Sequence, residues 1–243
     1  MWTIFWKEIR GFFSTLTGYV VIVVFLVLNS LFMWVFPGQF NIMESGYASL
    51  DSLFTIAPWA FLLLVPAITM RMIADEKRMG TLELLYTRPV NELQIVVAKY
   101  LASWVLVLFS LLPTLVFFWS VSRLGSPPGN IDAGGTWGSY IGLLFLGGIY
   151  ASIGIFASSL TDNQIVAFIV AVVLSFLMLN GFEFISGLAG SGKVSYFISR
   201  IGIQFHYNSI SRGVLDSRDL LYFTGVILFF IMSTRLVLQS SKW

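Results

Sequence analysis

The chain consists of long apolar stretches separated by short clusters of charged residues. No Asp, Glu, Lys or Arg occurs for 33 residues after Arg10, for 29 after Asp132, for 23 after Lys99 or for 19 after Asp51. A helix needs about 20 mostly apolar residues to cross the hydrocarbon core of a membrane. The pattern therefore predicts six membrane-spanning helices, over about 19–36, 53–72, 96–119, 139–158, 165–184 and 220–238.

Residues 1–17, before the first span, have the pattern of an amphipathic helix. Polar side chains share one helical face: Thr3, Lys7, Arg10 and Ser14. Apolar side chains cover the other face and include two tryptophans one turn apart, and tryptophan prefers the membrane–water interface. We therefore expect a helix that lies along the membrane surface. Its interfacial residues are Trp2, Trp6, Lys7, Glu8 and Arg10.

The composition narrows the class of protein further. Hydrophobic residues make up 57% of the chain and charged residues 11%, with a mean hydropathy of +0.86. Soluble domains carry about 25% charged residues, so a soluble domain and a disordered chain are both excluded. The net charge of +2 gives no support to a nucleic-acid partner. The absence of cysteine excludes disulfides and thiolate metal sites.

The distribution of Lys and Arg predicts the orientation of the chain. With the N-terminus in the cytoplasm, nine of these residues face inward and five face outward, which favours both termini in the cytoplasm. The long link at 73–95 is then cytoplasmic, and the segment at 185–219 is external. Lys99 and Arg235 lie near the predicted span ends, where we expect their side chains to extend to the lipid headgroups.

The cytoplasmic link 73–95 combines a charged run with an apolar stripe. Its first part, 75–78, is charged, and Leu82, Leu85 and Tyr86 then share one helical face. A solvated loop would explain the charges but not the stripe. A short helix that docks on a cytosolic partner explains both.

The residues of this link resemble a known family. The run Glu76-Lys77-Arg78-Met79-Gly80-Thr81-Leu82-Glu83-Leu84-Leu85 looks like the "E-[KR]-x-x-G-T-L-E-x-L" motif of ABC-2 type transporter permeases, which lies between their second and third spans. The resemblance covers 1–243 as one transmembrane domain, and it is greatest to the gliding-motility (GldF-type) permease subunits of Bacteroidetes. It implies an all-α integral membrane protein with six transmembrane helices. The N-terminal helix would be interfacial, a cytoplasmic coupling helix would join spans two and three, and external re-entrant helices would join spans five and six.

The resemblance also implies a division of labour between subunits. The permease would not be an enzyme: it would hold no catalytic residue, no metal and no cofactor of its own. ATP and Mg would bind in a separate cytosolic ABC ATPase. The residues expected to dock that ATPase are Glu76, Lys77, Arg78, Gly80, Thr81, Glu83, Leu84 and Leu85. A second permease copy or a related membrane subunit, a periplasmic auxiliary protein and membrane lipid are the other expected partners, in the inner membrane of a bacterium.

Two questions about function stay open at this stage. The ATPase could drive export of a hydrophobic or amphiphilic molecule, or it could drive a mechanical signal to a periplasmic protein without transport. A copper-handling permease of the nitrous-oxide-reductase type is a further alternative, although one histidine and no cysteine count against direct metal transfer.

Three sequence features receive structural interpretations. The stretch 187–193 matches the G-x-x-x-x-G-K loop that binds phosphates, but Val194 stands where the motif needs Ser or Thr, so we interpret it as a flexible turn. His206, the only histidine, is interpreted as a structural residue. Small residues four apart in the fourth span, such as Gly154 and Ser158, predict close helix packing within the subunit.

Overall fold

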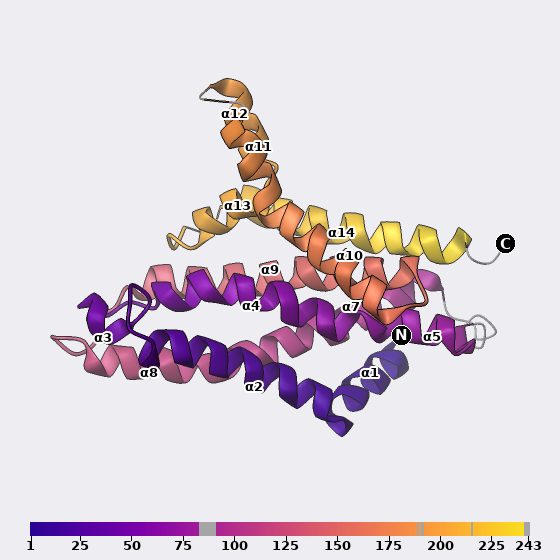
Figure 1. Cartoon of the computed structure of the whole chain (residues 1–243), viewed down its shortest axis with the longest axis horizontal. Helices are drawn as coiled ribbons and strands as arrows, with labels where there is room; N and C mark the ends of the chain where they lie inside the picture. The colour runs from indigo at the N-terminus through magenta and orange to yellow at the C-terminus, as the bar shows by residue number, and fades with distance from the viewer. Residues whose placement is uncertain (83–90, 189, 191, 215, 241–243) are drawn as a thin grey trace.

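The computed structural model describes the chain except for residues 83–90, 189, 191, 215 and 241–243, and the described part is helical without a strand (Figure 1). Six helical stretches are long and apolar enough to cross a membrane, as predicted. They are α2–η1 (Leu16–Ser30, Leu31–Val35), α4–α5 (Asp51–Thr69, Arg71–Arg78), α7–η2–α8 (Glu92–Leu111, Leu112–Thr114, Leu115–Leu124), α9 (Ala133–Leu160), α10–η3–α11 (Gln164–Phe176, Leu177–Gly181, Phe182–Leu188) and α14 (Ser217–Ser240). The shorter helices are α1 (Trp2–Ser14), α3 (Ile42–Ser45), α12 (Lys193–Ser199) and α13 (Ile203–Ile210).

The helical stretch of the second span runs past its predicted end. The prediction ended it at residue 72, whereas the helical stretch continues through α5 to Arg78. The charged run 75–78 is therefore part of a helix, and side chains of other helices neutralise part of its charge. The third span contains Pro113 within the single 3-10 turn η2, as expected because proline cannot donate a backbone hydrogen bond.

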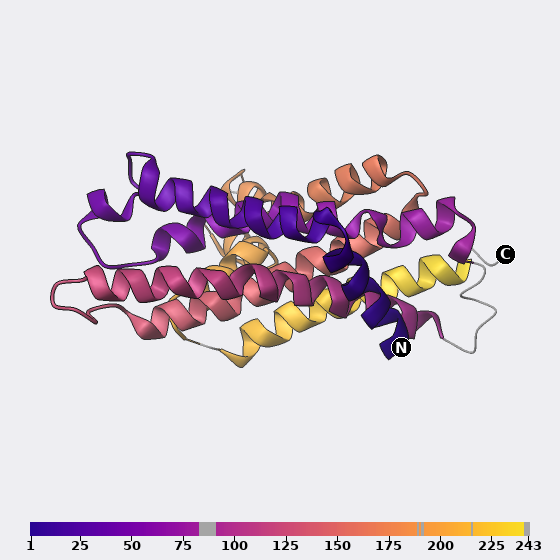
Figure 2. The ribbon, with the colours of Figure 1, turned by 90° about the horizontal axis from the view of Figure 1, so that it is seen from below.

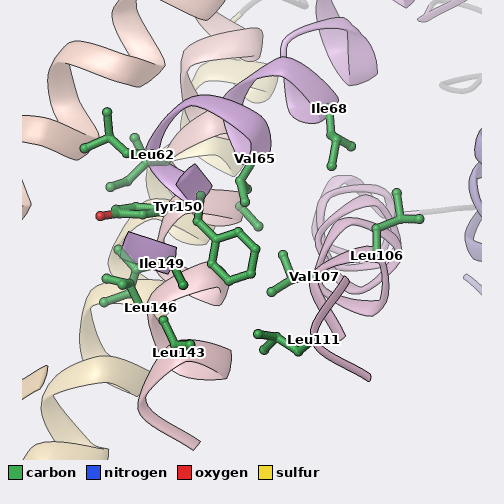
Figure 3. Close-up of a cluster of buried hydrophobic side chains, with 14 of the residues drawn as sticks. Leu62, Val65, Ile68, Leu106, Val107, Leu111, Leu143, Leu146, Ile149 and Tyr150 are labelled. Carbon is green, nitrogen blue, oxygen red and sulfur yellow. The ribbon is translucent and has the colours of Figure 1, made fainter. Parts of the chain in front are cut away.

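Helix α9 forms the centre of the bundle. It packs against α4, α7, α10 and α14, and most of its side chains are buried. Figure 3 shows side chains of α4, α7 and α9 meeting in one apolar cluster, which is continuous with the rest of the core. The labelled members are Leu62, Val65 and Ile68 from α4, Leu106, Val107 and Leu111 from α7, and Leu143, Leu146, Ile149 and Tyr150 from α9.

The small residues of α9 allow the neighbouring helices to approach closely. A Cβ atom added at Gly147 would lie 2.5 Å from Cγ1 of Val107 on α7. At Gly154 it would lie 1.9 Å from Oγ1 of Thr69 on α4. The predicted packing role of these small residues within the subunit is confirmed.

The bundle has two distinct ends. Helices α1 and α5, the start of α7 and the end of α14 lie at one end, here named the α5 end (Figures 1 and 2). Helix α3 and the turn between α8 and α9 lie at the opposite end, the α3 end. The first span therefore begins at the α5 end and the last span ends there, as an even number of crossings requires.

The segment 185–219 contains short helices, as predicted. α11 and α12 form an arm that projects sideways from the bundle (Figure 1), and the Ser186 and Ser195 hydroxyls join its two helices at 2.8 Å. The stretch 187–193, which matches the G-x-x-x-x-G-K motif, runs from the end of α11 to the start of α12. Its residues 189 and 191 lie outside the described part. Helix α13 returns to the bundle, where it packs on α9 and α14.

His206 fastens α13 to the start of α14. Its Nδ1 lies 2.6 Å from Oδ1 of Asp219, its Nε2 lies 2.8 Å from the Arg200 carbonyl, and its ring stacks on Tyr222 at 3.9 Å. On another side of α13, the Tyr207 hydroxyl donates to the Phe54 carbonyl of α4 at 2.9 Å. The geometry supports the structural interpretation of His206.

Candidate functional site

Helix α1 packs along the α5 end by one apolar edge. Ile9 and Phe12 are buried in the core, whereas Trp2 and Trp6 are 65% and 54% exposed. The helix contacts α7 and the start of α2. The predicted helix is present, and the place of its tryptophans in the membrane surface stays a prediction.

Lys99 is the hub of an ion cluster that joins α1, α5 and α7. Its ammonium donates to Glu8 Oε1 at 2.8 Å and to the Met72 carbonyl at 2.7 Å, and it lies 3.0 Å from Glu76 Oε2. An ammonium has three donors, and two of them have hydrogen-bond acceptors here, while the contact with Glu76 Oε2 is an ion pair. Lys99 is fully buried. The expectation that its side chain extends to the headgroups is wrong, because two carboxylates within the protein bind the charge.

Lys7 completes the cluster from the surface side. Its ammonium donates to Glu76 Oε1 at 2.9 Å and lies 3.9 Å from Glu8 Oε1. Burial lowers the pKa of Lys7, but the hydrogen bond and the charges of the two glutamates outweigh it, so the pKa lies above its ordinary value. Two lysines thus balance the charge of two glutamates. Buried charges are tolerated in a protein only when they are paired in this way.

The Ser158 side chain of α9 hydrogen-bonds to the backbone where α4 meets α5, and this set of contacts is named the Ser158 clasp. Its hydroxyl accepts from the backbone N–H groups of Ile73 and Ala74, both at 3.0 Å, and donates to the Met70 carbonyl at 2.8 Å. A side chain inserted among the backbone hydrogen bonds is a recognised cause of a break in a helix. The joint of the second span is therefore attached to the central helix at one side chain.

Two further contacts attach α5 to the turn between α9 and α10. The Lys77 ammonium donates to the Ser159 carbonyl, and the Gln164 amide donates to the Asp75 carboxylate. Together with the ion cluster and the Ser158 clasp, these contacts link α5 to four other helices.

A hollow of about 230 Å³ lies between α1 and α5. Arg71 lines it and donates to the Thr17 hydroxyl at 2.6 Å, while its guanidinium lies 5.5 Å from the centre of the Phe12 ring. Met79, which also lines it, is 66% exposed. The carboxylates of Glu8, Asp75 and Glu76 line it as well, so the hollow gives the α5 end an accessible surface that is partly apolar and carries charges of both signs.

The predicted docking residues fall into three groups. Glu76 and Lys77 turn inward to the contacts described above, while Arg78 is exposed at the end of α5. Gly80 follows with a φ of +69°, which favours glycine, and the Thr81 hydroxyl donates to the Glu76 carbonyl at 3.4 Å. Glu83, Leu84 and Leu85 lie outside the described residues, as do Leu85 and Tyr86 of the predicted stripe. The docking role of the whole set stays a prediction.

The sequence prediction missed the structural roles of Lys99 and Ser158. A signal was present for Lys99, because a lysine within an otherwise apolar span usually has a partner inside the protein. No such signal marks Ser158, since serine is common in membrane helices. Arg10, placed in the predicted interfacial set, is exposed and has no part in the ion cluster.

The arrangement at the α5 end suits the transmission of force between helices. Within the described part of the chain, no three His, Asp or Glu side chains are grouped so that they could hold a metal ion. The described contacts are instead ion pairs and hydrogen bonds between helices that are distant in sequence. The fold and the site together define a multi-pass helical membrane protein in which the Lys–Glu ion pairs of the described residues lie at the α5 end.

The family follows from a comparison with known protein families. Residues 36–211, well over half of the chain, match the family described as ABC-2 family transporter proteins. The chain belongs to this family and is a membrane permease subunit of an ABC transporter. Such a subunit is not itself catalytic, because the ATPase activity lies in a partner ABC ATPase. No curated protein matches the chain.

Proposed function

We propose that the α5 end faces the cytoplasm and couples a docked ABC ATPase to the membrane spans. The excess of Lys and Arg on this side supports the orientation, with both termini in the cytoplasm of a bacterium and the bundle in its inner membrane. ATP and Mg bind in the ATPase subunit. The permease then passes on the movement that ATP binding and hydrolysis produce.

The ion cluster is the observation that carries this proposal. Lys99 joins α1, α5 and α7 within 3.0 Å, and Ser158 attaches the same region to α9. A displacement applied to the residues after α5 therefore reaches four helices through a continuous set of close contacts. Contiguous packed and hydrogen-bonded elements are the physical means by which such coupling is carried.

The surface offered to the ATPase begins at the exposed end of α5. Arg78 and Met79 are exposed there, and the link with Gly80, Thr81, Glu83, Leu84 and Leu85 follows them. Leucine side chains would supply buried contact, and the charged residues would orient the two subunits. Glu76 acts in this scheme from inside, as a residue that positions α5.

The transported object, or the lack of one, divides two versions of this function. The resemblance to gliding-motility permeases supports a role in gliding, with a second permease copy or related subunit and a periplasmic auxiliary protein. ATP-driven flux of an amphiphile in proteoliposomes would establish export. A conformational response to ATP without any flux would establish the mechanical version.

Co-purification tests the docking surface directly. Arg78→Glu combined with Met79→Glu, and separately Leu85→Asp, should reduce recovery of the ATPase with the permease at least tenfold. Arg123→Glu is the control, because Arg123 is exposed near the α3 end. Recovery of the ATPase equal to wild type with both docking variants would refute docking at this surface.

A further inference from the structure

Two hollows lie on either side of α13 and share two amide side chains. One, of about 260 Å³, lies between α13 and the η3–α11 stretch, and the other, of about 190 Å³, lies between α13 and the start of α4. Gln204 and Asn208 line both. Figure 1 places α13 at the base of the arm formed by α11 and α12. The two hollows therefore border one polar ridge on the part of the bundle nearer the α3 end.

Charged side chains that have no ion partner among the described residues line both hollows. Glu183 and Arg212 line the first hollow, and Asp51 lines the second. The ion pairs of the described residues involve none of these three. All three side chains are exposed, so they are accessible to a ligand. Here the charges face two accessible hollows.

An apolar strip continues from the second hollow along the lipid-facing surface. Trp59 lines that hollow, and its ring centre lies 6.3 Å from that of Phe176 on α10. One turn further toward the α5 end, Leu63 on α4 and Val173 on α10 are 52% and 50% exposed. A polar cavity that opens onto an apolar strip fits an amphiphile, with its headgroup in the cavity and its chain on the strip.

We infer that the two hollows bind the headgroup of a zwitterionic phospholipid that carries a primary ammonium group. The Arg212 guanidinium matches the planar, multiple-acceptor geometry of a phosphate. The carboxylates of Glu183 and Asp51 match the ammonium, and the amides between them supply neutral hydrogen bonds. The acyl chains lie along the strip that begins at Trp59. This inference does not depend on ATPase docking, because every group it uses belongs to the permease.

Lipid retention by the purified permease tests the site. The full chain is extracted from nanodiscs that contain equal amounts of phosphatidylethanolamine and phosphatidylglycerol with identical acyl chains, and native mass spectrometry counts the lipids that stay bound. We expect phosphatidylethanolamine to be retained in preference. Arg212→Gln should lower its retention about tenfold, as expected for the loss of a charge-assisted hydrogen bond.

Two variants make the result specific. Arg218→Gln removes an exposed arginine that lines neither hollow, and it should leave retention unchanged. Glu183→Gln should shift the preference from phosphatidylethanolamine toward phosphatidylglycerol without lowering total lipid, a change that unfolding would not produce. Equal retention of the two lipids by wild type, or equal losses with Arg212→Gln and Arg218→Gln, would overturn the inference.

A second experiment decides whether the lipid is a permanent component of the permease or its cargo. The permease is reconstituted with its ATPase and fluorescent phosphatidylethanolamine, and ATP is added. Movement of the labelled lipid between leaflets assigns it as cargo, and retention without movement assigns it as a structural lipid. Failure of the ATPase to bind would leave the first experiment intact, so that result would count against the proposed function alone.

Discussion

A buried lysine in a membrane helix is stable only when the protein replaces the water around its charge. Lys99 meets this condition with two carboxylates and one carbonyl oxygen, all within 3.0 Å of its ammonium. The balance is local, because removal of one member leaves the others buried and uncompensated.

Lys99→Met should therefore destabilise the protein strongly. Loss of one partner of a buried ion pair costs about 3–5 kcal/mol, because the remaining charges stay in a medium of low polarity. Chemical unfolding in detergent micelles measures the effect. The triple variant Lys99→Met, Glu8→Gln and Glu76→Gln removes the stranded charges and should recover most of the loss. Wild-type stability of the single variant would contradict the role of Lys99 as hub.

The raised pKa of Lys7 predicts that the contact between α1 and α5 depends on pH. Its pKa in the folded protein is raised above 10.5, so its ion pair adds stability below that pH and loses it as pH rises through the raised value. We expect α1 to loosen only above about pH 10.5. A fluorophore attached to the cysteine of the Arg10→Cys variant measures the movement of α1. The label is at one position because the chain has no other cysteine. Lys7→Arg should move the transition to still higher pH, and an unchanged transition would assign it to another group.

The joint between α4 and α5 is the element on which the proposed coupling depends. Ser158→Ala would leave the N–H groups of Ile73 and Ala74 without their acceptor in a buried place, at a cost of about 1–3 kcal/mol. Ser152→Ala is the matched control, because among the described residues that buried hydroxyl bonds within its own helix, to the Ile149 carbonyl. We expect lower unfolding stability and weaker ATPase stimulation by the permease for the first variant alone. Similar behaviour of both would show that the clasp has no special role.

At the element scale, the sequence predicted what hydrophobicity and length decide. The charge-free stretches locate six spans, and the spacing of α1 identifies its apolar edge. The helix of the second span continues through the charged run 75–78, where Glu76 meets lysines at positions 7 and 99. That neutralisation is a tertiary contact across 69 and 23 residues of sequence, and no local pattern records it.

For the whole molecule, the close approach of the helices to α9 sets the packing of the bundle. Gly154→Ala would place its Cβ against Thr69, and overpacking of this kind costs about 1–3 kcal/mol. Gly225→Ala is the control, because a Cβ there meets no atom within 4 Å, and it should be neutral or stabilising. Thermal unfolding in micelles separates the two. Equal melting temperatures would show that α4 can move away from α9 freely.

The arrangement of the two charged regions along the bundle was only partly predictable. The resemblance indicated a docking link at one end, and helices over 185–219 at the other. It could not indicate that α13 would lie between two hollows, because their walls come from α4, α9, η3 and α11 as well. A cavity is a property of how elements meet, and Glu183 and Arg212 line one hollow although 29 residues of sequence separate them.

The ion cluster also constrains how the chain enters the membrane during synthesis. Glu8 and Glu76 leave the ribosome before Lys99, the second of the two lysines that balance them, has been made. Until the third span emerges, both carboxylates must stay in the headgroup layer, where water still reaches them. We therefore expect α1 and α5 to pack against α7 only after the third helix has been inserted, because Lys99 contacts both glutamates. Cross-linking of α1 to α5 in chains arrested before residue 99 would contradict this order.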